Sequence, residues 1–143
     1  FASIEMLLGV PEHQVPLPGG RRASQSDIWV LARVADGFVS IAVEGKVAEP
    51  FDRTVREWFA DESPGKRERL AYLAETLGQE ISRLNEVRYQ VLHRTASAII
   101  EARRFGAAHA VMLVHSFSPT RERFAGSWTA WASRRPRSTA RTR

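Results

Sequence analysis

Asp27, Glu44 and Lys46 are the residues of this chain whose types and spacing could perform catalysis. Carboxylates on adjacent strands repel each other unless a cation lies between them, and oxygen donors without His or Cys favour Mg²⁺ or Mn²⁺. A lysine two residues after Glu44 can position an attacking water and oppose the charge that develops on a phosphoryl group. The chemistry indicated by this set is metal-dependent hydrolysis of a phosphodiester.

The element that must position these side chains is a β-hairpin. Two β-rich runs, residues 28–34 and 38–44, flank the dipeptide Asp36-Gly37. Asp and Gly tolerate the positive φ that tight hairpin turns require. The sequence therefore predicts a hairpin with Asp36 and Gly37 as the two central turn residues.

This turn determines which side chains share a face of the hairpin. It places Asp27 opposite Lys46 and Trp29 opposite Glu44, and all four side chains then point to one side. The two carboxylates become diagonal neighbours. The other side is the expected core face, made of Ile28, Val30, Val34, Val39, Ile41, Val43 and Val47. The alternative interpretation is that the charged residues form only a salt-bridged hairpin end.

Three helical segments follow the hairpin, as shown by apolar residues at helical spacing and by capping residues. They are residues 53–60 after Asp52, residues 66–77 between Ser63-Pro64 and Gly78, and residues 85–105 before Gly106. In the last segment, Glu101, Arg103 and Arg104 are expected to face water.

The remaining segments predict strands and turns. The apolar run 110–114 is typical of a strand that is buried on both faces. Before the hairpin, only residues 13–17 favour a short edge strand, and residues 18–22 are predicted to form a turn because Pro and Gly precede Arg21-Arg22. The order of hairpin, helices and strand predicts an α/β domain whose last strand joins a mixed sheet after a helical crossover.

Composition and charge limit the class of protein. The chain has 143 residues, 43% of them hydrophobic, and no cysteine, which excludes disulfides and thiolate metal sites. The longest uncharged apolar stretch, residues 107–117, is too short for a membrane helix. We therefore expect a protein of the cytoplasm with no membrane partner.

The domain boundaries follow from length and from the basic end of the chain. The length suits a single domain, which we place at residues 1–132. Trp128 and Trp131 indicate a terminal helix, and residues 133–143 are expected to be a disordered basic tail. That tail holds five of the 21 basic residues, so residues 1–133 carry 16 basic and 16 acidic residues. Residue 1 is Phe, and we expect the N-terminus to be truncated.

The motif around the hairpin resembles a known superfamily. Ser26-Asp27 followed by Glu44-Gly45-Lys46, a helical region and a late apolar strand is similar to the PD-(D/E)XK nuclease superfamily, in which Ser26 stands at the Pro position. That superfamily has the fold of type II restriction endonucleases. With the sequence YQVLHRT at residues 89–95, the chain resembles an uncharacterised bacterial family of this superfamily over residues 11–118.

The resemblance implies a role for each matching residue. Asp27 and Glu44 would bind Mg²⁺ or Mn²⁺ together with the backbone carbonyl of Gly45, and Lys46 would be the catalytic lysine. Glu12 would be an additional acid at the metal. The helix would contribute the substrate-binding residues Gln90, His93 and Arg94.

Three functions follow as hypotheses. The first is a metal-dependent nuclease that hydrolyses nucleic acid, for which we favour DNA over RNA, built on a restriction endonuclease-like core. A homodimer is compatible with it, because cutting two strands needs two sites. The second is a catalytically silent domain of the same fold that acts in binding. The third is an unrelated α/β domain with a surface salt bridge.

Overall fold

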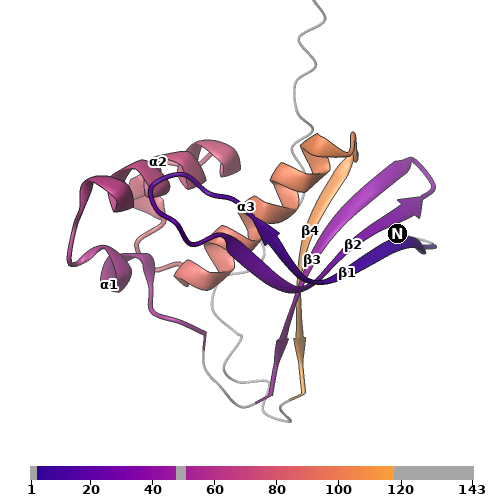
Figure 1. Ribbon diagram of the computed structural model, residues 1–143, viewed down its shortest axis with the longest axis horizontal. Coiled ribbons are helices and arrows are strands. Elements are labelled where there is room, and N and C mark those ends of the chain that lie inside the picture. Colours follow the sequence, from indigo (N-terminus) through magenta and orange to yellow (C-terminus); the bar gives the residue numbers. More distant parts are fainter. Residues whose placement is uncertain (1–2, 48–50, 118–143) are drawn as a thin grey trace, which may run out of the picture.

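Four strands form one mixed sheet in the order β1-β2-β3-β4 in a computed structural model that describes residues 3–47 and 51–117 (Figure 1). β1 (Glu5–Val15), β2 (Ser24–Val34) and β3 (Gly37–Lys46) are antiparallel neighbours. β4 (His109–Ser116) pairs in parallel with β3. Parallel pairing requires a crossover, and the helices between β3 and β4 supply it.

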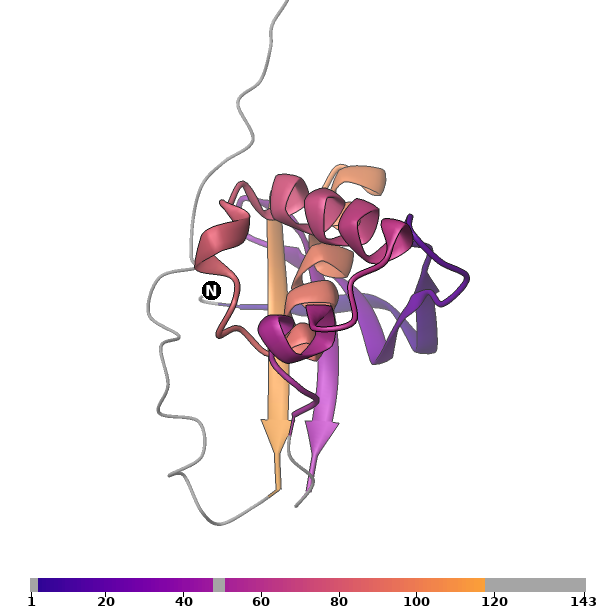
Figure 2. The same ribbon diagram turned by 90° about the vertical axis from the view of Figure 1, so that its left-hand side faces the viewer.

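The crossover contains four helical segments: α1 (Val55–Phe59), α2 (Pro64–Leu77), the 3₁₀ helix η1 (Ile81–Arg83) and α3 (Tyr89–Arg104). Helix α3 contacts β2, β3 and β4 on one side and α2 on the other. It therefore lies between the sheet and α2, as Figures 1 and 2 show from two directions. No described helix is long and apolar enough to span a membrane.

The main core lies between the helices. Leu73 and Leu92 are almost fully buried there, and the ring of Trp58 stacks on that of Tyr89 with centroids 4.0 Å apart. Between α3 and the sheet, Trp29 lies 5.0 Å from the ring of Phe105 at the end of α3. Burial of these large rings fixes α3 against both neighbours.

The hairpin forms, but its predicted register is wrong by two residues. Val34 pairs with Gly37, so the turn residues are Ala35 and Asp36. This register moves the small, exposed Ala35 from the strand into the turn and pairs Val39 with Ala32 rather than with Val34, so that these three residues are buried together. A shift of two preserves the alternation of side chains, so the division into two faces survives.

The prediction of which hairpin face is covered is wrong in part. Val34 and Val39 are buried, but Ile28 is 44% and Val47 is 62% exposed. Helix α3 instead covers the face that carries Glu44 and Lys46, because these polar side chains have hydrogen-bonding or ionic partners there. The charged face of the hairpin is thus the inner one at this end of the sheet.

The helix boundaries were predicted best where a cap is local. Ser63 caps α2, and Gly78 ends it with a left-handed φ of 62°. For α1, however, the cap is Thr54 rather than Asp52, because Thr54 and Glu57 form a reciprocal capping box. Helix α3 begins at Tyr89 rather than at residue 85, because the carbonyl of Asn85 accepts a hydrogen bond from the first turn of α1.

Three burial or length predictions are also wrong. Glu101 is buried rather than facing water, because α3 is covered on that side by β1 and β2. Leu113 of β4 is 48% exposed, since α3 covers only one face of this outer strand. β1 is longer than the predicted residues 13–17, because backbone pairing with β2 extends it to Glu5. The predictions for Trp128, Trp131 and residues 133–143 lie outside the described residues.

Candidate active site between β3 and α3

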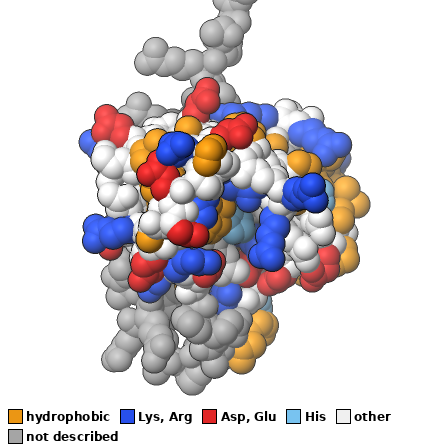
Figure 3. Space-filling view, turned by 60° about the vertical axis from the view of Figure 1, so that its left-hand side comes forward, with side chains coloured by type: hydrophobic (Ala, Val, Ile, Leu, Met, Phe, Trp, Pro, Cys, Tyr) orange, Lys and Arg blue, Asp and Glu red, His pale blue; other side chains and the backbone are white. Residues whose placement is uncertain are grey.

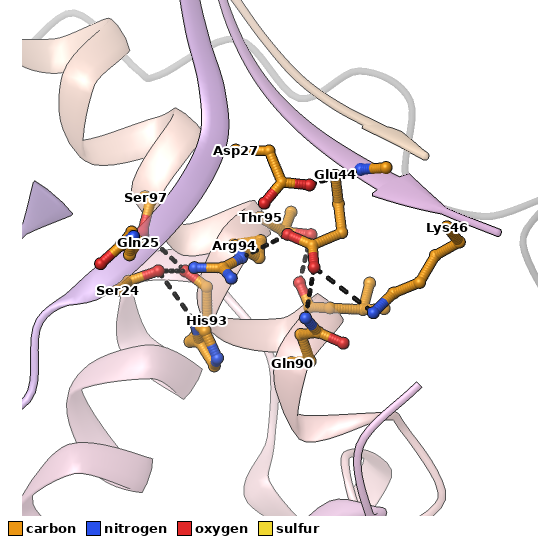
Figure 4. Close-up of polar contacts among 12 residues, drawn as sticks. Ser24, Gln25, Asp27, Glu44, Lys46, Gln90, His93, Arg94, Thr95 and Ser97 are labelled. Carbon is orange, nitrogen blue, oxygen red and sulfur yellow. Dashed lines mark hydrogen bonds and ion pairs between the residues drawn. The ribbon is translucent and has the colours of Figure 1, made fainter. Parts of the chain in front are cut away.

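Two short-range patterns place the central side chains. Glu44 and Lys46 lie two residues apart on β3, so they point to the same side, and they are only 4% and 7% exposed. Gln90 and Arg94 lie four residues apart on α3 and share one face of the helix. Because α3 packs on this side of β3, the two pairs face each other (Figure 4).

Glu44 is the centre of the resulting network. Arg94 donates from Nε to Glu44 Oε2 at 2.9 Å, and Gln90 donates from Nε2 to Oε1. Lys46 Nζ lies 3.4 Å from the same Oε1 atom. A buried carboxylate is costly unless it is paired and hydrogen-bonded, and here two cations and an amide surround it. Three of the predicted residues therefore meet at Glu44.

Asp27 approaches from the neighbouring strand. Its Oδ2 atom accepts a hydrogen bond of 2.7 Å from the backbone N–H of Gly45, directly beyond the last β2–β3 pair, Ile28 and Val43. The side chain is exposed, unlike that of Glu44. Figure 4 shows the two carboxylates next to each other. The predicted juxtaposition of Asp27, Glu44 and Lys46 is therefore present in the structure.

His93 belongs to the same helix but has a different partner. Its Nδ1 atom lies 2.7 Å from Ser24 Oγ at the start of β2. Burial, together with the positive charges of Arg94 and Arg69, lowers the pKa of His93 to about 3. The imidazole is therefore neutral at physiological pH. The hydrogen bond between its ring and Ser24 positions β2 against α3, and the ring is not hydrogen-bonded to Glu44.

Glu12 is not brought into the carboxylate pair. It adopts a φ of 52°, unusual for a residue other than Gly, and its carboxylate accepts a hydrogen bond from Gln25 Nε2. Within residues 3–47 and 51–117, no three His, Asp or Glu side chains are grouped closely enough to hold a metal ion. Of the predicted metal ligands, Asp27 and Glu44 lie together, and Gly45 contacts Asp27 through its backbone N–H.

Sequence reasoning missed two buried polar residues near the site. Ser24 is 1% exposed and joins His93, and the available signal was a pair of small hydroxyl residues, Ser24 and Ser26, at alternate positions just before Asp27. Arg69 of α2 is 9% exposed and bonds to the loop before Ser24. Nothing in its helical spacing distinguished it from a surface arginine.

A cavity of about 620 Å³ lies elsewhere, among α1, α2 and η1. Its walls are mainly apolar, with Phe59, Leu70 and Ile81, and Arg56 and Arg67 also line it. Both arginines are ion-paired, with Glu86 and Glu62 respectively. None of the residues around Glu44 lines this cavity, so it is separate from the candidate active site.

Comparisons with known proteins identify a family but no individual relative. Neither a curated protein nor a solved structure matches the chain. A family model does match residues 1–133, which include every residue of the site described above. The chain therefore belongs to the family described as Domain of unknown function (DUF6946).

Proposed function

We propose that this chain is a metal-dependent nuclease-like phosphodiesterase that hydrolyses nucleic acid and has a restriction endonuclease-like core of the PD-(D/E)XK type. The observation that carries the proposal is the convergence of Asp27, Glu44 and Lys46 from two adjacent strands, with Gln90 and Arg94 of α3 facing them. The α/β architecture with a mixed sheet and a helical crossover is compatible with such a core.

The donor chemistry at the site suits one hard divalent cation. Asp27, Glu44 and the Gly45 carbonyl offer oxygen ligands, which Mg²⁺ and Mn²⁺ prefer. The side chains in contact with Glu44 include no His or Cys. When bound, the ion would lower the pKa of a water molecule and offset negative charge on the phosphate. Glu44 would have to share its oxygens with this ion and with its present donors.

The chain's own cations complete the proposed chemistry. Lys46 is held beside Glu44 with little exposure, so its ammonium is fixed where a developing negative charge can be opposed without reorganisation. Arg94 uses Nε for Glu44, and a guanidinium has further N–H donors in a rigid fork. Those donors can bind a phosphate oxygen. Asp27, on the exposed side, is placed to orient a water molecule for attack.

A specific observation favours the second candidate, a catalytically silent binding domain. Arg94 and Lys46 already balance the charge of Glu44, and Gln90 donates another hydrogen bond to the Glu44 carboxylate. A buried carboxylate paired in this way needs no metal for its stability. In that case the network would be structural, and the domain would bind its partner without hydrolysing it.

Metal-dependent stabilisation separates the two candidates. The nuclease proposal predicts that Mg²⁺ or Mn²⁺ raises the melting temperature relative to EDTA. At a metal concentration 100 times the Kd, the free energy of unfolding should rise by about 2.7 kcal/mol. Asp27→Asn should abolish this response. Glu101→Gln, which alters a buried carboxylate outside the site, should retain it. An equal metal response in Asp27→Asn would contradict the assigned ligands.

Cleavage of supercoiled plasmid tests the reaction itself. Purified protein should nick plasmid in Mg²⁺ or Mn²⁺, and Lys46→Met should lose this activity while remaining folded. Nicking that survives Lys46→Met would reject the assigned site. Absence of both nicking and metal stabilisation in the original chain would favour the silent binding domain.

A further inference from the structure

The loop between β1 and β2 is tied to α2 by a buried arginine. Arg69 donates hydrogen bonds to four backbone carbonyls of this loop, those of Leu17, Pro18, Gly20 and Arg22, at 2.8 to 3.3 Å. Arg69 is only 9% exposed. A guanidinium bonded to four carbonyls along six residues fixes the path of the backbone between them.

Close backbone packing reinforces this anchorage. A Cβ atom at Gly19 would lie 2.0 Å from the carbonyl oxygen of Gly65, in the first turn of α2. Gly19 also has a φ of 75°, and Gly20 has a φ of 155°. The predicted turn is therefore present as a bend that packs against the first turn of α2, and Figure 1 shows this loop beside α2. Residues 17–22 are called the platform below.

This platform presents two exposed arginines without acidic partners. Arg21 and Arg22 are exposed, and neither makes a side-chain hydrogen bond or ion pair with any residue that the structure describes. Most other exposed arginines of the described segments are paired with a carboxylate: Arg33, Arg53, Arg56, Arg67, Arg83 and Arg104. The other two, Arg88 and Arg103, donate to backbone carbonyls, so Arg21 and Arg22 stand out among the described exposed arginines because their side chains make neither kind of contact.

The platform lies beside the candidate active site. It leads directly into Ser24, which contacts His93, and the next residue of α3, Arg94, binds Glu44. Asp27 follows Arg22 by five positions, so their Cα atoms are at most about 18 Å apart. That upper limit corresponds to about five nucleotide steps along the axis of a DNA duplex. Figure 3 shows Lys and Arg side chains gathered beside a recess in which a histidine is visible.

We infer that Arg21 and Arg22 bind backbone phosphates of a DNA strand to one side of the bond held at Asp27 and Glu44. The inference rests on the proposed function and extends it, because it makes the substrate a polymer that spans both the platform and the carboxylates. Arg69 is a positioning residue that holds the two guanidinium groups at the edge of the site. Phosphate contacts of this kind give affinity without sequence preference.

The test is the binding of a fluorescent DNA duplex to the full chain in EDTA, measured by anisotropy over a range of salt concentrations. The double variant R21A/R22A should bind about tenfold more weakly at low salt. Its plot of log K against log salt should be shallower by about two, because each lost phosphate contact removes about 0.9 from the slope. The matched control is R56A/R67A, which removes two exposed but ion-paired arginines and should change affinity less than twofold.

The outcomes separate this inference from the proposed hydrolysis. Equal losses in the two double variants, an unchanged salt slope in R21A/R22A, or no binding by the original chain would each overturn the role of the platform. Glu44→Gln should keep DNA binding and lose nicking. If the original chain binds through Arg21 and Arg22 but does not nick plasmid with metal, the platform stands and the hydrolytic function fails. If the original chain nicks plasmid and R21A/R22A binds and nicks as well as the original chain, the hydrolytic function stands and the role of the platform fails.

Discussion

A buried carboxylate is found at each end of α3, one from β3 and one from the helix itself, and the two are held differently. Near the first turns, Glu44 receives a hydrogen bond of 2.9 Å from Arg94 and a second from Gln90. Near the last turn, Glu101 is even more buried, at 2% exposure. Two basic side chains approach its Oε1 atom, His13 at 3.6 Å and Arg104 at 3.7 Å. No described donor reaches its Oε2 atom.

The difference shows that burial alone does not identify a site. Desolvation penalises both carboxylates, but only Glu44 has charge-assisted hydrogen bonds of good length to offset it. Glu44 is also adjacent to a second carboxylate, Asp27, whereas the side chain beside Glu101 is His13, which stacks on the ring of Trp29. The end of α3 with converging polar groups is the better candidate for chemistry.

Among the variants that compare the two ends of α3, removing the Glu44 carboxylate should have the largest effect on stability. Glu44→Ala removes the carboxylate that accepts from Arg94 and that Lys46 Nζ faces, and we expect a loss of about 3–5 kcal/mol in the free energy of unfolding. Urea denaturation measures this loss, with the m-value showing whether the folded state stays compact. Glu44→Gln, which retains the shape and an acceptor, should lose less. Equal stability of Glu44→Ala and the original chain would mean that the network contributes nothing.

Removing one arginine from each end of α3 should give the next largest difference. Arg94→Met leaves the Glu44 carboxylate with Lys46 and Gln90 only, and we expect a loss of about 2–3 kcal/mol. Arg104→Met changes a guanidinium that is 68% exposed, and its pairing with Glu101 should contribute less than about 1 kcal/mol. Thermal unfolding of both variants at low and high salt provides the comparison. Similar losses of stability in Arg94→Met and Arg104→Met would contradict the conclusion that the two carboxylates are held differently.

His93, between the two ends, extends the comparison to pH. Its folded pKa of about 3 lies below the ordinary value of 6.5, so the unfolded chain binds a proton between these pH values and the folded chain does not. The neutral ring therefore contributes stability that is present above about pH 6.5 and is lost as the pH falls towards 3. The loss from pH 7 to pH 5 should be about 2 kcal/mol.

The control for this pH dependence is His93→Gln, which does not titrate and offers Ser24 a polar partner. Denaturation curves at pH 7, 6 and 5 should show a smaller dependence on pH in this variant than in the original chain. Parallel curves would place the pH dependence on other groups and would contradict the burial of a neutral His93.

The residues grouped at Glu44 were predictable because their relations are short-range or follow from one hairpin. The spacing of Glu44 and Lys46 on a strand and of Gln90 and Arg94 on a helix fixes which faces they occupy. The pairing of Asp27 with this group survived a register error because a shift of two residues does not change the face. Local chemistry also determined the caps at Ser63 and Gly78.

The features that sequence reasoning missed depend on tertiary packing. Glu101 has the helical position of a surface residue, and it is buried because β1, with His13, and β2 pack against this part of α3. Arg69 likewise reaches its four carbonyls because the β1–β2 loop crosses α2. The inner face of the hairpin was misjudged because charged residues were assumed to face solvent, whereas α3 supplies partners for Glu44 and Lys46.

The smallest expected effect comes from neutralising Glu101. Glu101→Gln removes a buried charge whose pairing distances exceed those of hydrogen bonds, so the relief of desolvation should balance or exceed the loss of attraction to His13 and Arg104. We expect the variant to be as stable as the original chain or up to about 1 kcal/mol more stable, as measured by urea denaturation at pH 7. A loss of more than about 2 kcal/mol would show that Glu101 is held as firmly as Glu44. Both ends of α3 would then have to be treated as built polar sites, and the preference for the Glu44 end would rest on Asp27 and Lys46 alone.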